Sequence, residues 1–113
     1  MDDFIVTTTN DLPGYEVVAV YGEVFGLVCR ARNLFANLSA GLRTLMGGEI
    51  HEYTRLLTDS RHQAITRLKE EARLMGANAV LAMRFDCNEI ANLVSEIAAY
   101  GTAVTVRKKS GQG

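Results

Sequence analysis

The sequence predicts an α+β fold, a two-layer sandwich in which one long helix lies across a mostly antiparallel sheet. Three observations lead to this prediction. A long amphipathic helical segment occupies the middle of the chain, and segments rich in apolar and β-branched residues precede and follow it. Glycines or turn residues separate these segments, so each is expected to form one element. The expected order is strand, strand, helix, long helix, strand, strand.

The N-terminal part of the chain is expected to form two strands. A short strand is expected at Phe4–Thr9, where β-branched residues predominate, and the turn residues of Asn10–Gly14 follow it. The next strand is long, Tyr15–Arg32, and both of its faces are largely apolar. A strand with one face in water alternates more regularly. We therefore expect this strand to be covered on both sides or to pack against a neighbouring subunit.

Gly22 and Gly26 interrupt the long strand. Glycines inside a strand predict a bulge, a bend or the close approach of another backbone. The segment is therefore expected to form either two strands or one strand that is kinked near Gly22.

Two helices are expected in the middle of the chain. In Asn33–Met46, leucines recur at intervals of three or four residues, and glycines follow at once. Ile50–Met75 is the long helix, and Gly76 is placed to end it. Its apolar stripe is expected to lie on the sheet. The stripe comprises Tyr53, Leu57, Ala64, Leu68, Ala72 and Met75, and a polar residue, Ser60 or Arg61, occupies the one remaining position along it.

Two strands are expected after the long helix, Asn78–Cys87 and Leu93–Arg107. Strict alternation divides the first of them into two faces. The face expected to meet the helix comprises Ala79, Leu81, Met83, Phe85 and Cys87. The other face comprises Val80, Ala82, Arg84 and Asp86. This second face carries two charges in otherwise apolar surroundings.

Size and composition predict one domain that associates with a partner. The 113 residues are enough for a single domain, 1–113, with flexible ends expected at 1–4 and 108–113. Hydrophobic residues make up 48% of the chain, at the upper end of the ordinary range. This excess suggests apolar surface that is reserved for a partner, most simply another copy of the chain. A well-filled core in a monomer is the alternative.

Charge and hydropathy argue against nucleic acids and membranes as partners. A net charge of −1 gives no basic field for a nucleic-acid backbone, and the basic residues at 107–109 are too few to change this. The chain has no apolar run long enough to span a membrane. The acidic N-terminus lacks the features of a signal peptide, so a cytoplasmic location and reduced thiols at Cys29 and Cys87 are expected.

Arg84 and Asp86 are the strongest candidates for a site. Their charges must reach solvent, a partner or each other. An ion pair between subunits is one interpretation, and a ligand-contacting pair that lines a ring cavity is the other. Arg30, near the end of the long strand, could join either arrangement.

The remaining candidates carry weaker signals. Glu49 follows two glycines at the expected start of the long helix, where backbone N–H groups could face an anion, although a self-capped hinge is favoured there. His51 is most simply a surface residue. Cys29 and Cys87 are expected to be small buried hydrophobic residues, which could still approach each other if their strands are neighbours. The chain has no Cys and His spacing typical of a metal site.

Several strings, in combination, resemble the YbjQ-like family of small bacterial proteins, and together they span Ile5 to Val106. They are IVTTTNDLPGYEV (5–17), GGEI (47–50), EYT (52–54), MGANAV (75–80), MRFD (83–86) and AYGTAV (99–104). The resemblance implies an α+β subunit with a dodecin-like β-α-β-β core that assembles into a ring-shaped homopentamer. It also implies a heavy-metal-binding domain, for which it supplies no set of ligands.

The function expected from these observations is that of a non-enzymatic, homo-oligomeric binding module. Its ring would enclose a site for a small ligand or a metal, most simply a soft divalent metal for which Cys29, Cys87 and His51 are the available ligands. A purely structural protein, whose ring serves assembly with a partner, is the alternative. An enzyme is the least favoured class, because no nucleophile, base and orienting group are spaced as partners.

Overall fold

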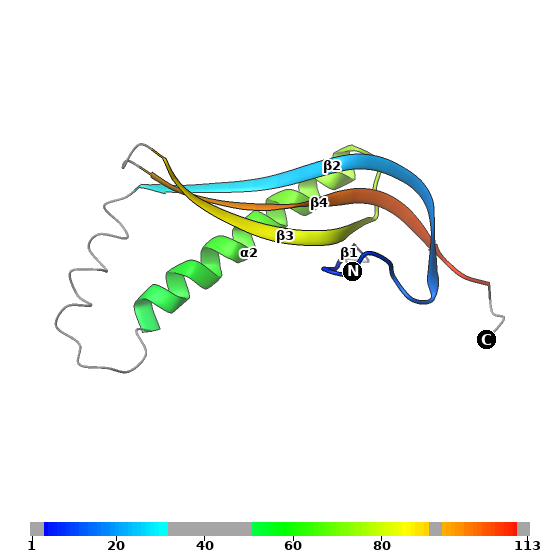
Figure 1. The fold of residues 1–113 in the computed structure, drawn as a ribbon, viewed down its shortest axis with the longest axis horizontal. Coiled ribbons are helices and arrows are strands. Elements are labelled where there is room, and N and C mark those ends of the chain that lie inside the picture. The colour runs from blue at the N-terminus through cyan, green and yellow to red at the C-terminus, as the bar shows by residue number, and fades with distance from the viewer. Residues whose placement is uncertain (1–3, 32–50, 91–93, 111–113) are drawn as a thin grey trace.

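The computed structural model describes residues 4–31, 51–90 and 94–110, which form a four-stranded sheet and one long helix (Figure 1). The elements are β1 (Ile5–Val6), β2 (Tyr15–Ala31), α2 (His51–Leu74), β3 (Ala79–Ile90) and β4 (Val94–Lys108). The sheet order is β1-β3-β4-β2; β1 pairs with β3 in parallel, and the other pairs are antiparallel. The predicted two-layer α+β fold is confirmed at this level, and the helix predicted at Asn33–Met46 lies outside the described residues.

Helix α2 packs on the sheet through buried residues spaced about one turn apart, three of which are small. Ser60, Ala64, Leu68 and Ala72 are fully buried, and the interval of four places them on one face of the helix. The backbones approach closely at Gly26 of β2, where an added Cβ would lie 2.1 Å from the carbonyl oxygen of Ala64. Gly26 therefore allows the close backbone approach that the sequence predicted.

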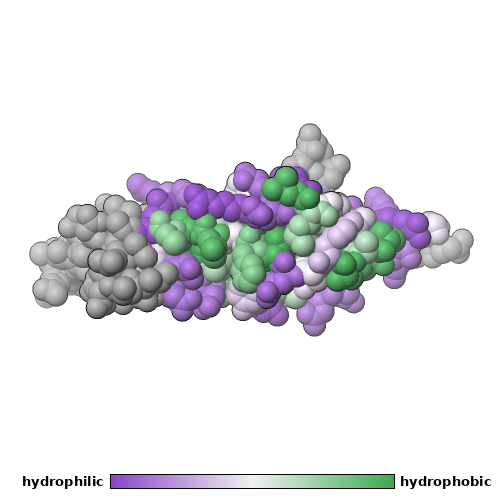
Figure 2. Space-filling model, turned by 90° about the horizontal axis from the view of Figure 1, so that it is seen from above, coloured by the Kyte–Doolittle hydropathy of each residue, from purple (hydrophilic) through white to green (hydrophobic). Residues whose placement is uncertain are grey.

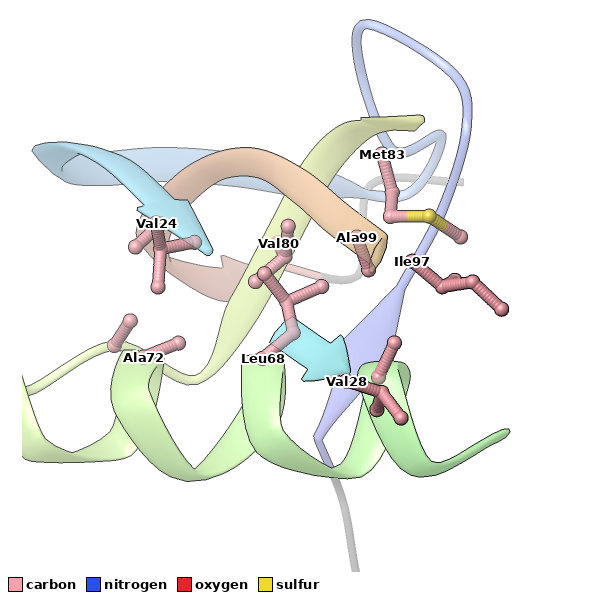
Figure 3. Close-up of a cluster of buried hydrophobic side chains, with 11 residues drawn as sticks. Val24, Val28, Leu68, Ala72, Val80, Met83, Ile97 and Ala99 are labelled. Atoms are coloured by element: carbon pink, nitrogen blue, oxygen red, sulfur yellow. The ribbon is translucent and has the colours of Figure 1, made fainter. Parts of the chain in front are cut away.

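The main core lies between α2 and the sheet (Figure 3). Side chains from β2, β3 and β4 point toward the helix and meet the buried side chains of α2. The labelled members in Figure 3 are Val24, Val28, Leu68, Ala72, Val80, Met83, Ile97 and Ala99. Because α2 contacts β2 and β4 far more than β3, β3 receives less cover from the helix than the other two strands.

Strand β2 is one continuous strand, which is one of the two predicted alternatives. Its register against β4 shifts twice, between Val17 and Ala19 and between Val20 and Gly22. Gly22 has a φ of 110°, in a region that favours glycine. These irregularities bend the strand without ending it, as Figure 1 shows.

A bulge in β3 overturns part of the predicted alternation. The pairing with β4 shifts between Leu81 and Arg84, and Ala82 has a φ of 55°. Because of this extra residue, the side chains before the bulge lie on the opposite faces from those expected by strict alternation with the residues after it. Val80 therefore belongs to the core under α2, whereas Ala79 and Leu81 lie on the opposite face. The prediction for residues 79–81 was wrong, while Met83 and Phe85 face the helix as predicted.

The N-terminal segment covers one end of the sheet face opposite α2. Ile5, Leu12 and Tyr15 pack there against a second cluster, which comprises Ala79, Leu81, Val104 and Val106. The pairing extends past β1, because the backbone N–H groups of Met83 and Ala82 donate to the carbonyls of Thr7 (2.9 Å) and Thr9 (2.8 Å). We call this segment, residues 4–14, the N-terminal strap.

Both predicted flexible ends include described residues that have backbone or ring contacts. The guanidinium of Arg73 lies 5.1 Å from the ring centroid of Phe4. Lys108 pairs with Tyr15, and the N–H of Lys109 donates to the carbonyl of Gly14 (2.9 Å). The end of β4 is thereby joined to the start of β2.

Candidate functional site

The sheet face opposite α2 is open beyond the N-terminal strap. Figure 2 views the molecule from this side and shows hydrophobic residues in a band along the long axis, with hydrophilic residues beside it. Phe25 is 47% exposed and Leu27 45% exposed, and both project from the part of β2 that the strap does not cover. The described large hydrophobic residues that are exposed lie on β2 or at the end of α2: Val17, Val18, Val20, Tyr21, Phe25, Leu27, Leu74 and Met75.

A hollow of about 460 Å³ lies on this open face. Its apolar floor is formed by Phe25 and Leu27 of β2 and by Ala98 and Tyr100 of β4. The strand register explains this grouping, because Phe25 pairs with Tyr100 and Leu27 pairs with Ala98, so each pair shares one face. The rings of Phe25 and Tyr100 lie 6.3 Å apart between centroids.

Carboxylates border the floor. Glu23 of β2, Asp86 of β3 and Glu96 of β4 line the same hollow, which we call the acidic groove. The side-chain amide of Asn88 donates to Asp86 Oδ2 (3.2 Å) and approaches Glu96 Oε1 (3.4 Å). Among the described residues, no cationic side chain forms an ion pair with any of these three carboxylates. The groove is therefore apolar at its centre and negative at its margin.

Arg84 and Asp86 share one sheet face, as predicted, but they do not pair with each other in the described structure. Asp86 lines the acidic groove, whereas Arg84 Nη1 donates to the carbonyls of Thr8 and Met83, each at 2.9 Å. Arg84 thus holds the N-terminal strap against the edge of the sheet. Whether either charge also meets a ligand or a second subunit stays a prediction.

Arg30 lies on the opposite side of the sheet. It follows Val24, Gly26 and Val28 on the face of β2 that points toward the helix. Its Nε donates to the buried Oγ of Ser60 (3.1 Å). Within one chain, Arg30 therefore lies on the other face of the sheet from Arg84 and Asp86, and whether it joins them between subunits stays a prediction. The physical reason is the even spacing along β2, which directs Arg30 to the face that α2 covers.

The two cysteines are exposed, in contrast to the prediction that they are buried. Cys29 pairs with Glu96 and Cys87 pairs with Ile97, and these neighbouring residues of β4 point to opposite faces. The cysteines therefore cannot approach each other within one chain. Cys29 lies on the open face near the acidic groove, and Cys87 lies on the helix side of β3, where α2 gives little cover.

The other predicted metal ligands give no cluster. Glu49 lies outside the described residues; His51 begins α2, but its side chain is likewise outside them. Among residues 4–31, 51–90 and 94–110, no three His, Cys, Asp or Glu side chains gather closely enough to hold a metal ion. One chain, as far as it is described, does not supply a complete set of metal ligands.

Sequence reasoning missed the acidic groove as a unit. The odd positions of β2 from Glu23 to Cys29 were visible as one face, but their partners on β4 were not. Only the register brings Glu96 and Tyr100 beside them. The clearest signal available was the apolar character of both faces of β2, which predicted surface reserved for a partner.

Comparisons with known proteins place these features in a family. Residues 4–107 match the YbjQ_1 family model, whose description is "Putative heavy-metal-binding". A "UPF0145 protein" from Lactococcus lactis subsp. cremoris (strain MG1363) is 53% identical over 108 residues, which cover 96% of this chain and 99% of the relative. A "UPF0145 protein" from Methanoregula boonei is 50% identical over 110 residues, which cover 97% of this chain and 92% of the relative.

A solved structure has the same fold. It is a protein with unknown function of the DUF74 family from Pediococcus pentosaceus, with a TM-score of 0.59 and 14% identity, covering 92% of this chain and 98% of that one. Within the described residues, no helix is long and apolar enough to cross a membrane. The match to the family model over nearly the whole chain, together with relatives at about half identity, shows that the chain belongs to the YbjQ-like, UPF0145 family.

Proposed function

We propose that this chain is a non-enzymatic subunit of a ring-shaped homopentamer with a dodecin-like β-α-β-β core, and that the ring binds a heavy metal or a small ligand. The observation that carries the proposal is the open apolar face of β2, where Phe25 and Leu27 are nearly half exposed beside an acidic margin. Such a face is costly to leave in water, so a protein partner is expected to cover it.

The position of β2 supports self-assembly. β2 is an edge strand of the sheet, and it carries most of the exposed large hydrophobic residues that the structure describes. Long apolar edge strands associate with other chains unless something covers them. The molecule is elongated, 59 × 30 × 24 Å, and its two sheet edges differ, so a contact between the two edges would join unlike surfaces. Contacts between unlike surfaces generate rings when the rotation closes.

The ligand site is proposed to form between subunits. Cys29 lies on the open face and offers one sulfur ligand. A tetrahedral site for a soft divalent metal requires four ligands. One described chain does not fit this requirement, so symmetry-related copies would have to supply the rest. The exposure of Cys29 on the face proposed for assembly supports this arrangement.

Native mass spectrometry, before and after addition of Cd²⁺, tests the proposal. We expect a mass of five chains and additional bound metal. The variant Cys29→Ser should lose the metal, and Cys87→Ser, on the other face, is the matched control that should keep it. A monomer at micromolar concentration would overturn the assembly, and a bare pentamer would overturn the metal site.

A purely structural ring is the second candidate, and one observation favours it. The floor of the acidic groove is apolar, which suits contact with a protein surface better than coordination of a metal ion. If the ring serves only assembly with a partner, its thermal unfolding should not respond to metals. Binding of a ligand to the folded state alone would raise the stability with ligand concentration. Thermal unfolding across a panel of metals and small anions separates the two candidates.

We also propose a cytoplasmic location. Cys29 and Cys87 are free thiols on opposite faces of the sheet, an arrangement that suits a reducing compartment.

A further inference from the structure

We propose that the acidic groove receives the basic end of β4, Lys108 and Lys109, from a second copy of this chain. The proposal rests on the self-assembly proposed above and names the two surfaces that meet. The groove is an apolar hollow of about 460 Å³ on the open face of the sheet. A partner that covers the groove would be stabilised by apolar groups against its floor and by positive charge at its margin.

The margin of the groove is negative, and no cation of the described residues pairs with its carboxylates. Glu23, Asp86 and Glu96 come from three neighbouring strands, so their charges surround one hollow. The amide of Asn88 is the hydrogen-bond donor that the described structure provides to Asp86 and Glu96. Like charges held around a low-dielectric floor repel one another and attract a cationic partner. A neutral partner would leave this repulsion in place.

The end of β4 presents the complementary charge. Arg107, Lys108 and Lys109 follow one another, and Arg107 is already paired through its Nε with Glu16 at 2.7 Å. Lys108 and Lys109 are exposed and have no carboxylate partner among the described residues. The pairing of Lys108 with Tyr15 and the bond from Lys109 N–H to Gly14 fix the backbone that carries them.

Lysine side chains suit this groove on two grounds. Their aliphatic stems can lie on apolar surface while the ammonium group reaches a charged margin. Phe25, Leu27 and Tyr100 offer such a floor, and the carboxylates stand at its sides. Aromatic faces add attraction for a cation. Both the apolar and the charged requirements of the groove are met by the same two residues.

The contact must form between copies. Glu96 precedes Lys108 on the same strand by about 12 residues, which is roughly 40 Å at the ordinary rise of a strand. The end of β4 therefore cannot fold back into its own groove. The groove and the basic end lie on different parts of one molecule, so each copy can offer its end to one neighbour and its groove to another. Such a contact repeats until a ring closes.

A charge exchange tests this contact. Lys108→Glu and Glu96→Lys each place like charges together, and we expect each to weaken association at least about tenfold. The chain that carries both substitutions restores opposite charges and should recover most of that loss. The matched controls are Arg55→Glu and Asp59→Lys, which make the same charge changes at exposed positions of α2 and should leave association unchanged.

Analytical ultracentrifugation over a dilution series provides the readout, with circular dichroism to show that each variant folds. The proposal is overturned if either single variant associates as tightly as the native chain, or if the combined variant recovers nothing. Recovery in the combined variant cannot arise from misfolding of the single variants. A native chain that stays monomeric would refute the proposed self-assembly itself, whereas an intact oligomer that is indifferent to the exchange would refute only this contact.

Discussion

Replacing Gly26 by alanine should push α2 outward from the sheet and destabilise the fold. An added Cβ would lie 2.1 Å from the carbonyl oxygen of Ala64, 2.4 Å from the N of Leu68 and 2.9 Å from its Cα. All three atoms belong to the backbone of α2, so no side chain can rotate to make room. The helix must instead move outward by roughly 1 Å to restore ordinary contact distances.

This movement would open the core on both sides of the contact. Val24 and Val28 flank Gly26 on the same face of β2, and both pack against α2. Overpacking of a core costs about 1–3 kcal/mol, and a clash between two backbones belongs at or above the upper end of this range. Alanine is otherwise the better strand residue by about 0.5–1 kcal/mol. We therefore expect the free energy of unfolding to fall by about 3 kcal/mol.

Urea unfolding at one fixed protein concentration measures this change, since self-association would shift the midpoint with concentration. Gly14→Ala is the control, because its added Cβ has no neighbour within 4 Å. That control should lose only about 1 kcal/mol, the cost of a left-handed conformation at a φ of 85°. A loss below about 1 kcal/mol in Gly26→Ala would show that the close packing of α2 on β2 is wrong.

Three further substitutions test the core, the bulge and the strap. Leu68→Ala should lower the free energy of unfolding by about 3 kcal/mol, because this side chain is fully buried under β2; urea unfolding checks it. Ala82→Gly should raise it by up to about 1 kcal/mol, since glycine relieves the left-handed φ of 55°; an equal loss would contradict the bulge. Arg84→Met should cost about 1 kcal/mol through the lost bond to Thr8, and amide exchange at Met83 should speed up.

The sequence was sufficient to predict the elements that the structure describes and insufficient to predict their register. The periodicity of α2 and the stop at Gly76 follow from local chemistry, and the structure has the helix at His51–Leu74 against the predicted Ile50–Met75. Strands were likewise found close to their predicted positions. Helix boundaries depend on interactions within one turn, so a single segment contains the information that determines them.

The candidate site depends on information that no single segment contains. Cys29 and Cys87 each lie in a segment that the sequence predicts to be a strand, and only their partners on β4, Glu96 and Ile97, show that they face opposite ways. The acidic groove requires three strands to be aligned at once. Long-range register is set by bulges and by packing against the helix, which is why the groove could not be recognised in advance.

The bulge at Ala82 determines which side of the sheet receives the charges of β3. Before it, Leu81 lies on the open side and the N-terminal strap covers it; after it, Arg84 and Asp86 lie on that same side. With regular alternation from Leu81, residues 84 and 86 would point toward α2, where a carboxylate would be buried at considerable cost. The strained φ of Ala82 is therefore the local cost of keeping Asp86 at the acidic groove while Val80 and Met83 both remain in the core. The same bulge directs two consecutive N–H groups, of Ala82 and Met83, to the strap, so the placement of the groove and the anchoring of the strap depend on one feature of the backbone.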